Sequence, residues 1–228
     1  MDGEPERKYE AQRIDLHTHS LLSDGEVVPS ELVRRAERMA HVAVGLTDHV
    51  DSSNLEWVAE RIVEVAEDLN ESRDIRVVSG VELTHVNPSR IPDLAKEARR
   101  IGIEMVVVHG ETPIEPVIEG TNLAALKCND VSFLAHPGLI TFKQAELAEK
   151  TQTYFELTSR RGHSLANGRI ARFAVKTGAK LLVNTDAHSP GELLTLEEAK
   201  MVAEGAGLEE SEVEEAVGIN PRLLLEEL

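Results

Sequence analysis

The chain has 228 residues, of which 41% are hydrophobic and 29% charged, a balance typical of a soluble globular protein. Its formal net charge of -17 argues against long nucleic acid as a partner, because binding to a phosphate backbone needs a basic face. The one cysteine, Cys128, excludes an intramolecular disulfide and a thiolate metal site.

Short apolar segments alternate with helix-like segments along the chain. Residues 1–12 form a polar extension without the apolar run of a signal peptide, and no later segment is apolar over the length of a membrane span. We therefore expect a cytoplasmic protein without a membrane partner. Strands are predicted near residues 14, 43, 77, 105, 132, 154 and 181.

Apolar residues spaced three and four apart predict the intervening helices. One helix begins at Pro29, with Leu32, Ala36, Met39 and Ala40 on one face, and a second covers residues 55–69. A third follows Pro92 and ends at Gly102, and shorter helices are expected over 122–127, 144–150 and 164–176. Residues 195–228 are expected to form acidic helices whose charged face is solvated.

Seven βα repeats indicate an α/β fold with a parallel sheet, in one domain over residues 1–228. Functional side chains at many strand ends favour a closed barrel, since barrel enzymes collect their chemistry from the loops at that end. An open, doubly wound sheet usually carries a glycine-rich phosphate turn, and neither GxGxxG nor a Walker A pattern occurs here. The sequence therefore predicts a barrel.

Six apolar segments run directly into histidine or carboxylate, which indicates a multinuclear metal site at one end of the barrel. The side chains delivered in this way are His17, His19, His49, Glu82, His109, His136, Asp186 and His188. Imidazole and carboxylate without thiolate suit zinc, manganese or iron, and the sequence does not rank these metals. The alternative, a set of unrelated polar strand caps, requires the same arrangement to arise by chance in every segment.

Several nearby residues have two interpretations. Asp24 lies in Ser23-Asp24-Gly25, which is also an ordinary turn sequence. Asp48 is expected to orient an imidazole rather than bind metal directly. His85 either faces the cleft, as a substrate contact, or caps a loop, and His41 is expected at the surface.

The segment Thr158 to Ser164, after the sixth predicted strand, carries Arg160, Arg161 and His163. The two guanidinium groups suit bidentate binding of a substrate phosphate, and His163 is a candidate proton donor to the leaving group. The alternative is a solvated basic turn. Glu156, within the strand itself, is interpreted as an inward barrel residue or a support of the ligands.

In order from Ile14 to His188, the chain contains the motifs DLHTHSLLSDG, LTDH, GVELTH, VVVHGE, LAHPG and NTDAH. These resemble the ordered motifs of the PHP (polymerase and histidinol phosphatase) family of metal-dependent phosphoesterases. The resemblance implies a distorted (β/α)7 barrel with two to three divalent metal ions in a cleft. The implied ligands of the three ions are, in turn, His17, His19, Glu82 and Asp186; Glu82 as a bridge with His109 and His136; and Asp24, His49 and His188.

The resemblance also implies the activity: hydrolysis of a small phosphorylated substrate, histidinol phosphate or a similar phosphomonoester, by a hydroxide that bridges two metals. Glu82, Asp186 and His188 would then be catalytic as well as ligands. A nuclease-like phosphodiesterase acting on nucleotides or short oligonucleotides is the alternative. A non-catalytic subunit of the ribonuclease P type is disfavoured, because the ligand set is complete. The oligomeric state stays open.

Overall fold

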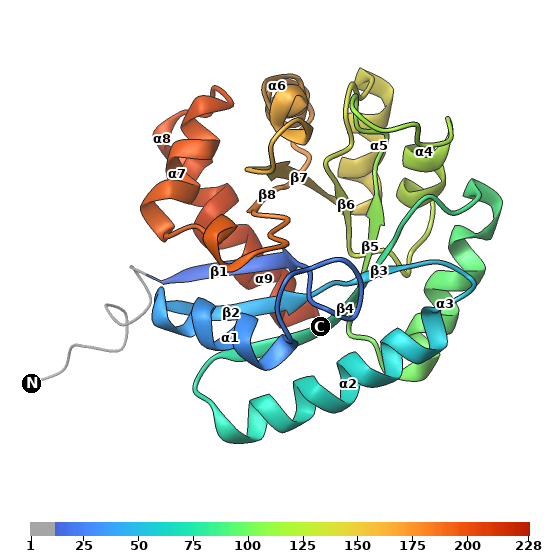
Figure 1. Cartoon of the computed structure of the whole chain (residues 1–228). Helices are drawn as coiled ribbons and strands as arrows, with labels where there is room; N and C mark the ends of the chain where they lie inside the picture. Colours follow the sequence, from blue (N-terminus) through green and yellow to red (C-terminus); the bar gives the residue numbers. More distant parts are fainter. Residues whose placement is uncertain (1–11) are drawn as a thin grey trace, which may run out of the picture.

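Parallel strands form one sheet that curls almost into a closed barrel (Figure 1). The computed structural model describes residues 12–228, so the predicted polar extension lies outside the described residues except for Gln12. The strands are β1 (Arg13–Thr18), β2 (His41–Leu46), β3 (His49–Val50), β4 (Arg76–Leu83), β5 (Met105–His109), β6 (Phe133–Ala135), β7 (Tyr154–Thr158) and β8 (Leu181–Asn184). Their order is β1-β2-β4-β5-β6-β7-β8, which confirms the seven predicted βα repeats.

The barrel is distorted where β1 meets β8. Only a few bonds join these strands: the Asp186 N–H donates to the carbonyl of His17, and the His19 N–H donates to the carbonyl of Ala187. Farther down, the Leu16 N–H donates to the side chain of Asn184 at 3.0 Å in place of a backbone partner. The barrel therefore closes at the carboxyl ends of the strands, where the histidines and carboxylates predicted as metal ligands lie.

The short strand β3 was not anticipated from the sequence. It pairs with β4 in parallel, and the pairing sets His49 opposite Glu82. This extra pairing brings the histidine of the LTDH motif into the cleft, although it lies beyond the end of β2.

Helices cover the outside of the barrel, as amphipathic patterning predicts (Figure 1). Their bounds are α1 (Pro29–Arg38), α2 (Leu55–Ser72), α3 (Ile91–Ile101), α4 (Thr121–Leu126), α5 (Phe142–Thr151), α6 (Asn167–Thr177), α7 (Leu196–Gly205), α8 (Glu210–Glu214) and α9 (Asn220–Glu227). Gly102 ends α3 with a φ of 116°, the left-handed conformation that a helix C-cap glycine favours. The predicted apolar face of α1 extended to Ala40. In the structure the helix ends at Arg38, and Ala40 is exposed.

The barrel interior is apolar below the cleft. Register pairs Glu82 with Val107, Val107 with Phe133, and Phe133 with Tyr154, so all four side chains face the same side of the sheet. Leu224 of α9 joins this buried apolar cluster. The acidic C-terminal helices thus contribute buried side chains to the fold as well as a solvated face.

His41 was expected at the surface, and that expectation is wrong. It is the first residue of β2 and only 4% exposed. It is buried because β2 lies between β1 and β4 in the sheet, where His41 pairs with Arg13. Burial lowers the pKa of His41 to about 4, so the imidazole is neutral at pH 7.

Among residues 12–228, no helix combines the length and apolarity needed to cross a membrane.

Candidate metal centre and substrate cavity

All nine residues predicted as metal ligands lie together at the carboxyl ends of the strands. They fall into overlapping groups in which the potential ligand atoms lie within 4.8 Å of one another. The groups are His17, His19 and Asp186; Glu82, His109 and His136; and His19, Asp24, His49 and His188. The third group contains His19 in addition to the predicted residues, so this imidazole lies between two groups.

Glu82 is the centre of the arrangement and is fully buried. Its Oε1 lies 3.5 Å from Nε2 of His17 and 3.5 Å from Nε2 of His136, whereas its Oε2 lies 2.7 Å from Nδ1 of His49. Burial by itself would raise the pKa of Glu82, but the surrounding imidazoles of His17, His49 and His109 hold it well below the usual range. Oε1 of Glu82 therefore lies between residues of the first and second groups, and Oε2 faces His49 of the third group.

Several atoms at this centre are buried without a hydrogen-bond partner, which is unusual because buried polar atoms are normally paired. They include Nε2 of His17, Nε2 of His19, Oε1 of Glu82 and Oδ1 of Asp186. Oδ1 of Asp186 lies 3.1 Å from Nε2 of His19 and 3.8 Å from Nε2 of His17. Ligands about 2.1 Å from a tetrahedral zinc ion are separated by roughly 3.4 Å, so the donor set and its spacing fit a divalent cation.

Glu156 supports the first group from the barrel interior. Nδ1 of His17 donates to Oε1 of Glu156 at 2.7 Å, and the backbone N–H of His136 donates to Oε2 at 3.0 Å. Because Nδ1 carries the proton, Nε2 of His17 presents its lone pair to the centre. Glu156 thus orients residues of two groups, in agreement with its interpretation as a support of the ligands.

Two of the residues predicted as ligands have strained backbones. His136 has a φ of 25° and Asp186 a φ of 55°, in the left-handed region that side chains other than glycine seldom adopt. Such strain costs on the order of 1–3 kcal/mol per residue and persists only where the surrounding structure enforces it. At both positions the unusual backbone turns the chain at a strand end, where the side chain joins the groups described above.

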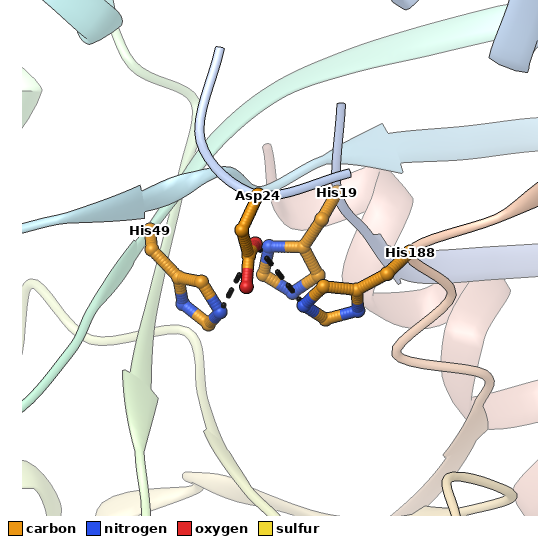
Figure 2. A group of neighbouring side chains, drawn as sticks. All are labelled: His19, Asp24, His49 and His188. Atoms are coloured by element: carbon orange, nitrogen blue, oxygen red, sulfur yellow. Dashed lines mark ion pairs between the residues drawn. The ribbon is translucent and has the colours of Figure 1, made fainter. Parts of the chain in front are cut away.

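The third group is the most exposed of the three, because the side chain of Asp24 is 58% exposed. Figure 2 shows its four side chains, with the ion pairs of Asp24 drawn as dashed lines. Oδ1 of Asp24 lies 3.2 Å from Nε2 of His188 and 3.6 Å from Nε2 of His49, and the rings of His19 and His188 stack at 4.1 Å. Although partial burial would raise the pKa of Asp24, the two imidazoles lower it. The structure therefore places Asp24 next to two of the predicted ligands, in addition to its position in a turn.

Asp48 was expected to orient an imidazole, and that expectation is wrong. Asp48 does not orient an imidazole, since its hydrogen bonds come from the loop that carries Asp24. It accepts the N–H of Ser20 at 2.8 Å, the hydroxyl of Ser20 at 2.8 Å and the hydroxyl of Ser23 at 2.7 Å. Asp48 lies between β2 and β3, and these three bonds hold its carboxylate to the segment from Ser20 to Ser23.

A cavity of about 250 Å³ opens beside these groups. Its lining adds side chains from the loops to the predicted ligands: Thr84, His85, Glu115, Arg160 and His163. Arg160 is 28% exposed, with Nε 3.6 Å from Oδ2 of Asp186. Arg161 is exposed and does not line the cavity, so of the two predicted arginines the structure places one at the site.

His163 is buried, and its Nδ1 lies 2.7 Å from the hydroxyl of Thr112. Burial and the nearby His136 lower its pKa to about 3. A neutral imidazole at pH 7 is poorly suited to protonate a leaving group, because an effective general acid has a pKa near the working pH.

Glu115 belongs to the cavity but was missed in the sequence. It lies in the loop between β5 and α4, six residues after His109, and not at a strand end. Hydrogen bonding to His109 and the charges of neighbouring imidazoles lower its pKa to about 2. The one local signal is the pair of prolines, Pro113 and Pro116, that enclose it.

A nearly closed parallel barrel with histidine and carboxylate groups at its carboxyl end defines a metal-site α/β-barrel protein. A family model described as the PHP domain matches residues 15–199. The chain is also 46% identical, over 217 residues, to a protein of Methanocaldococcus jannaschii described as uncharacterised, an alignment covering 95% of this chain and 100% of that one. The chain therefore belongs to the PHP family.

More distant relatives differ in their stated roles. The chain is 26% identical to ribonuclease P protein component 3 of Methanosarcina barkeri, over 89% of this chain and 84% of that one. Its fold resembles that of histidinol phosphate phosphatase from Lactococcus lactis, solved with zinc, L-histidinol and phosphate (TM-score 0.62, 15% identity, covering 87% and 95%). It also resembles a chain of archaeal ribonuclease P with mature tRNA (TM-score 0.64, 16% identity, covering 92% and 87%). At these identities the two structures establish the fold alone.

Proposed function

We propose that this chain is a metal-dependent phosphoesterase that hydrolyses a small phosphomonoester, with histidinol phosphate as the first substrate to test. The observation that carries the proposal is the position of Glu82, whose Oε1 lies between His17 of the first group and His136 of the second, beside a cavity lined by Arg160. Divalent cations bound there would act as Lewis acids on a phosphoryl group and supply a nucleophile from water near neutral pH.

The predicted ligands would hold three cations. His17, His19, Glu82 and Asp186 would hold one cation, and Glu82 with His109 and His136 a second. Asp24, His49 and His188 would hold a third, at the more open side of the cleft (Figure 2). We propose that Glu82 and Asp186 are essential to catalysis because each contacts imidazoles of two groups, and that His188 acts through the third ion.

Arg160 is proposed to bind the phosphate. Its guanidinium reaches Oδ2 of Asp186 and, through Nη1, the carbonyl of Asp186 at 3.3 Å, so its N–H groups lie at the edge of the ligand groups. A guanidinium presents parallel N–H donors that match two phosphate oxygens. His85 and His163 line the same cavity, and we propose that they contact the rest of the substrate.

The size of the cavity favours a small substrate. At about 250 Å³ it lies below the roughly 300–1,000 Å³ common for drug-sized ligands. A phosphorylated metabolite or the end of a short chain fits this volume, whereas a nucleic-acid duplex does not.

A phosphodiesterase acting on nucleotides or short oligonucleotides is the second candidate. One observation favours it: residues 157–185 contain no aspartate or glutamate, and their six basic residues are Arg160, Arg161, Arg169, Arg172, Lys176 and Lys180. The guanidinium groups of Arg169 and Arg172 each lie 4.9 Å from the centre of the Phe173 ring, which meets Phe142 edge-on. Aromatic and arginine groups of this kind bind single-stranded nucleic acid by stacking.

The two candidates are separated by a substrate panel. Inorganic phosphate released from histidinol phosphate and other phosphomonoesters is compared with mononucleotide released from dinucleotides, with manganese or zinc present. Faster turnover of monoesters supports the first proposal, and an Arg172→Ala variant should leave that rate unchanged. Hydrolysis of dinucleotides alone, slowed by Arg172→Ala, would replace the first proposal with the second.

A further inference from the structure

Glu115 has more imidazole neighbours than its place in a loop would predict. Its Oε2 lies 3.2 Å from Nε2 of His85 and 3.2 Å from Nε2 of His109, and its Oε1 lies 3.4 Å from Nε2 of His163. Three segments that are distant in the sequence therefore direct an imidazole nitrogen at one carboxylate. The side chain of Glu115 is 35% exposed, so the cluster opens to solvent on one side.

The loop that carries Glu115 is held in place at both ends. The carboxylate of Glu111 accepts the backbone N–H of Gly120 at 3.0 Å and that of Asn122 at 2.9 Å. Ile114 packs against Gly162 so closely that a Cβ at that glycine would lie 2.6 Å from its Cδ1. Proline on each side of Ile114 and Glu115 restricts the backbone further, because its ring fixes φ. Glu115 is therefore preorganised in front of His109.

His85 is directed to the same place by an unfavourable backbone conformation. It follows β4 with a φ of 52°, and its side chain is 42% exposed. Its ring lies 5.3 Å from the ring of His109. A solvent-exposed residue can relax to an unstrained backbone conformation unless an interaction holds it in the strained one. Backbone strain of this kind is concentrated at functional sites.

We propose that His85, His109 and Glu115 bind an additional divalent cation at the mouth of the cavity. Their potential ligand atoms all lie within 4.8 Å of one another. Two imidazoles and one carboxylate form a ligand set used for zinc and for iron, with further positions left open for water or substrate. The exposure of His85 and Glu115 lets an ion enter and exchange, unlike the buried centre around Glu82. The site shares the imidazole of His109 with that centre through different nitrogens: Nε2 lies 3.2 Å from Oε2 of Glu115, and Nδ1 is buried without a hydrogen-bond partner among residues 12–228. His85 and Glu115 belong to no predicted group.

The inference goes beyond the proposed function and is tested without any measurement of turnover. The protein is loaded with zinc, dialysed against buffer with a fixed free zinc concentration, and its bound metal is counted by plasma mass spectrometry. His85→Ala and Glu115→Gln should each lose the same single equivalent that the wild type holds. Glu119→Gln, which changes an exposed carboxylate of the same loop, should retain the wild-type count.

Two outcomes overturn the proposal. Wild-type metal content and affinity in both variants would show that Glu115 only pairs with the imidazoles. A loss in Glu115→Gln but not in His85→Ala would make Glu115 a positioning residue for His109 and remove His85 from the site. A wild-type protein without phosphatase activity but with an equivalent that depends on His85 and Glu115 would refute the proposed function and retain this site.

Discussion

Oε1 of Glu156 accepts a hydrogen bond from Nδ1 of His17 at 2.7 Å, on the opposite side of the imidazole from the nitrogen that faces Glu82. Asn184 donates to the same oxygen at 3.1 Å, so the carboxylate is itself fixed. The barrel interior thus determines which nitrogen of His17 is free to bind a cation.

Glu156→Gln is therefore expected to weaken metal binding while the fold survives. The amide keeps the size of the carboxylate but loses the charge that favours the Nδ1–H tautomer, and changes of this type weaken metal affinity by about 10–100-fold. Competition with a fluorescent chelator measures the effect. Glu146→Gln, on the exposed side of α5, is the control. Equal affinities in the two variants would contradict the role given to Glu156.

Asp48→Asn should act on the third group alone. The change places an amide where Asp48 now accepts bonds from Ser20 and Ser23, so the loop that carries Asp24 loses its anchor. We expect one metal equivalent to bind about tenfold more weakly and the others to be unaffected, as followed by calorimetric titration with manganese. Asp51→Asn alters a similar exposed turn outside the site, and an identical titration curve for the two variants would refute the prediction.

Arg160→Ala should raise the KM for a phosphomonoester by at least about tenfold, or ~1.4 kcal/mol, because the phosphate loses a charged donor at the cavity wall. Arg161→Ala should change KM little, since this side chain is exposed away from the cavity. Steady-state kinetics on the two variants provide the comparison, with metal content measured alongside because Arg160 also contacts Asp186. A larger effect from Arg161 would relocate the phosphate site.

Because His41 is buried in the folded protein, the free energy of unfolding should decrease in mild acid. Its pKa is about 4 in the folded protein and about 6.5 when unfolded. Between these values the unfolded chain binds more protons, so the free energy of unfolding decreases as pH falls from 6.5 to 4 and this contribution is constant outside that window.

Urea unfolding at pH 7 and pH 5 tests the effect. From pH 7 to pH 5 the wild type should lose about 2 kcal/mol more than His41→Gln does. The comparison with the variant removes the contribution of all other titrating groups. An equal loss in both proteins would mean that folding does not lower the pKa of His41.

Much of the barrel, and the clustering of the residues predicted as ligands, follows from the sequence, because both depend on short-range patterns. His109 and His136 each follow an apolar run, and parallel strands present such residues at one end of a barrel. Asp186 and His188 repeat the spacing of His17 and His19. Asp48, by contrast, lies between β2 and β3, and its hydrogen bonds with Ser20 and Ser23 could not be inferred from its position next to His49.

The loop residues required three-dimensional information. Glu115 reaches His109 only because Glu111 ties the base of the loop and Ile114 packs against Gly162, a contact between segments far apart in the chain. Arg160 and Arg161 are chemically equivalent in the sequence, and only the turn after β7 decides that Arg160 faces the cavity. Sequence patterns predict which side chains lie at the ends of the strands. Which loop residues reach the cavity depends on tertiary packing.

The most direct test of the account is the release of inorganic phosphate from histidinol phosphate by the wild type and by Glu82→Gln, each with manganese or zinc. The account predicts metal-dependent turnover of roughly one per second or faster in the wild type, and none above background in the variant, which keeps its fold but loses the charge shared by two ligand groups. Near-wild-type turnover by Glu82→Gln would contradict the shared metal centre, and no release by the wild type would contradict the proposed substrate.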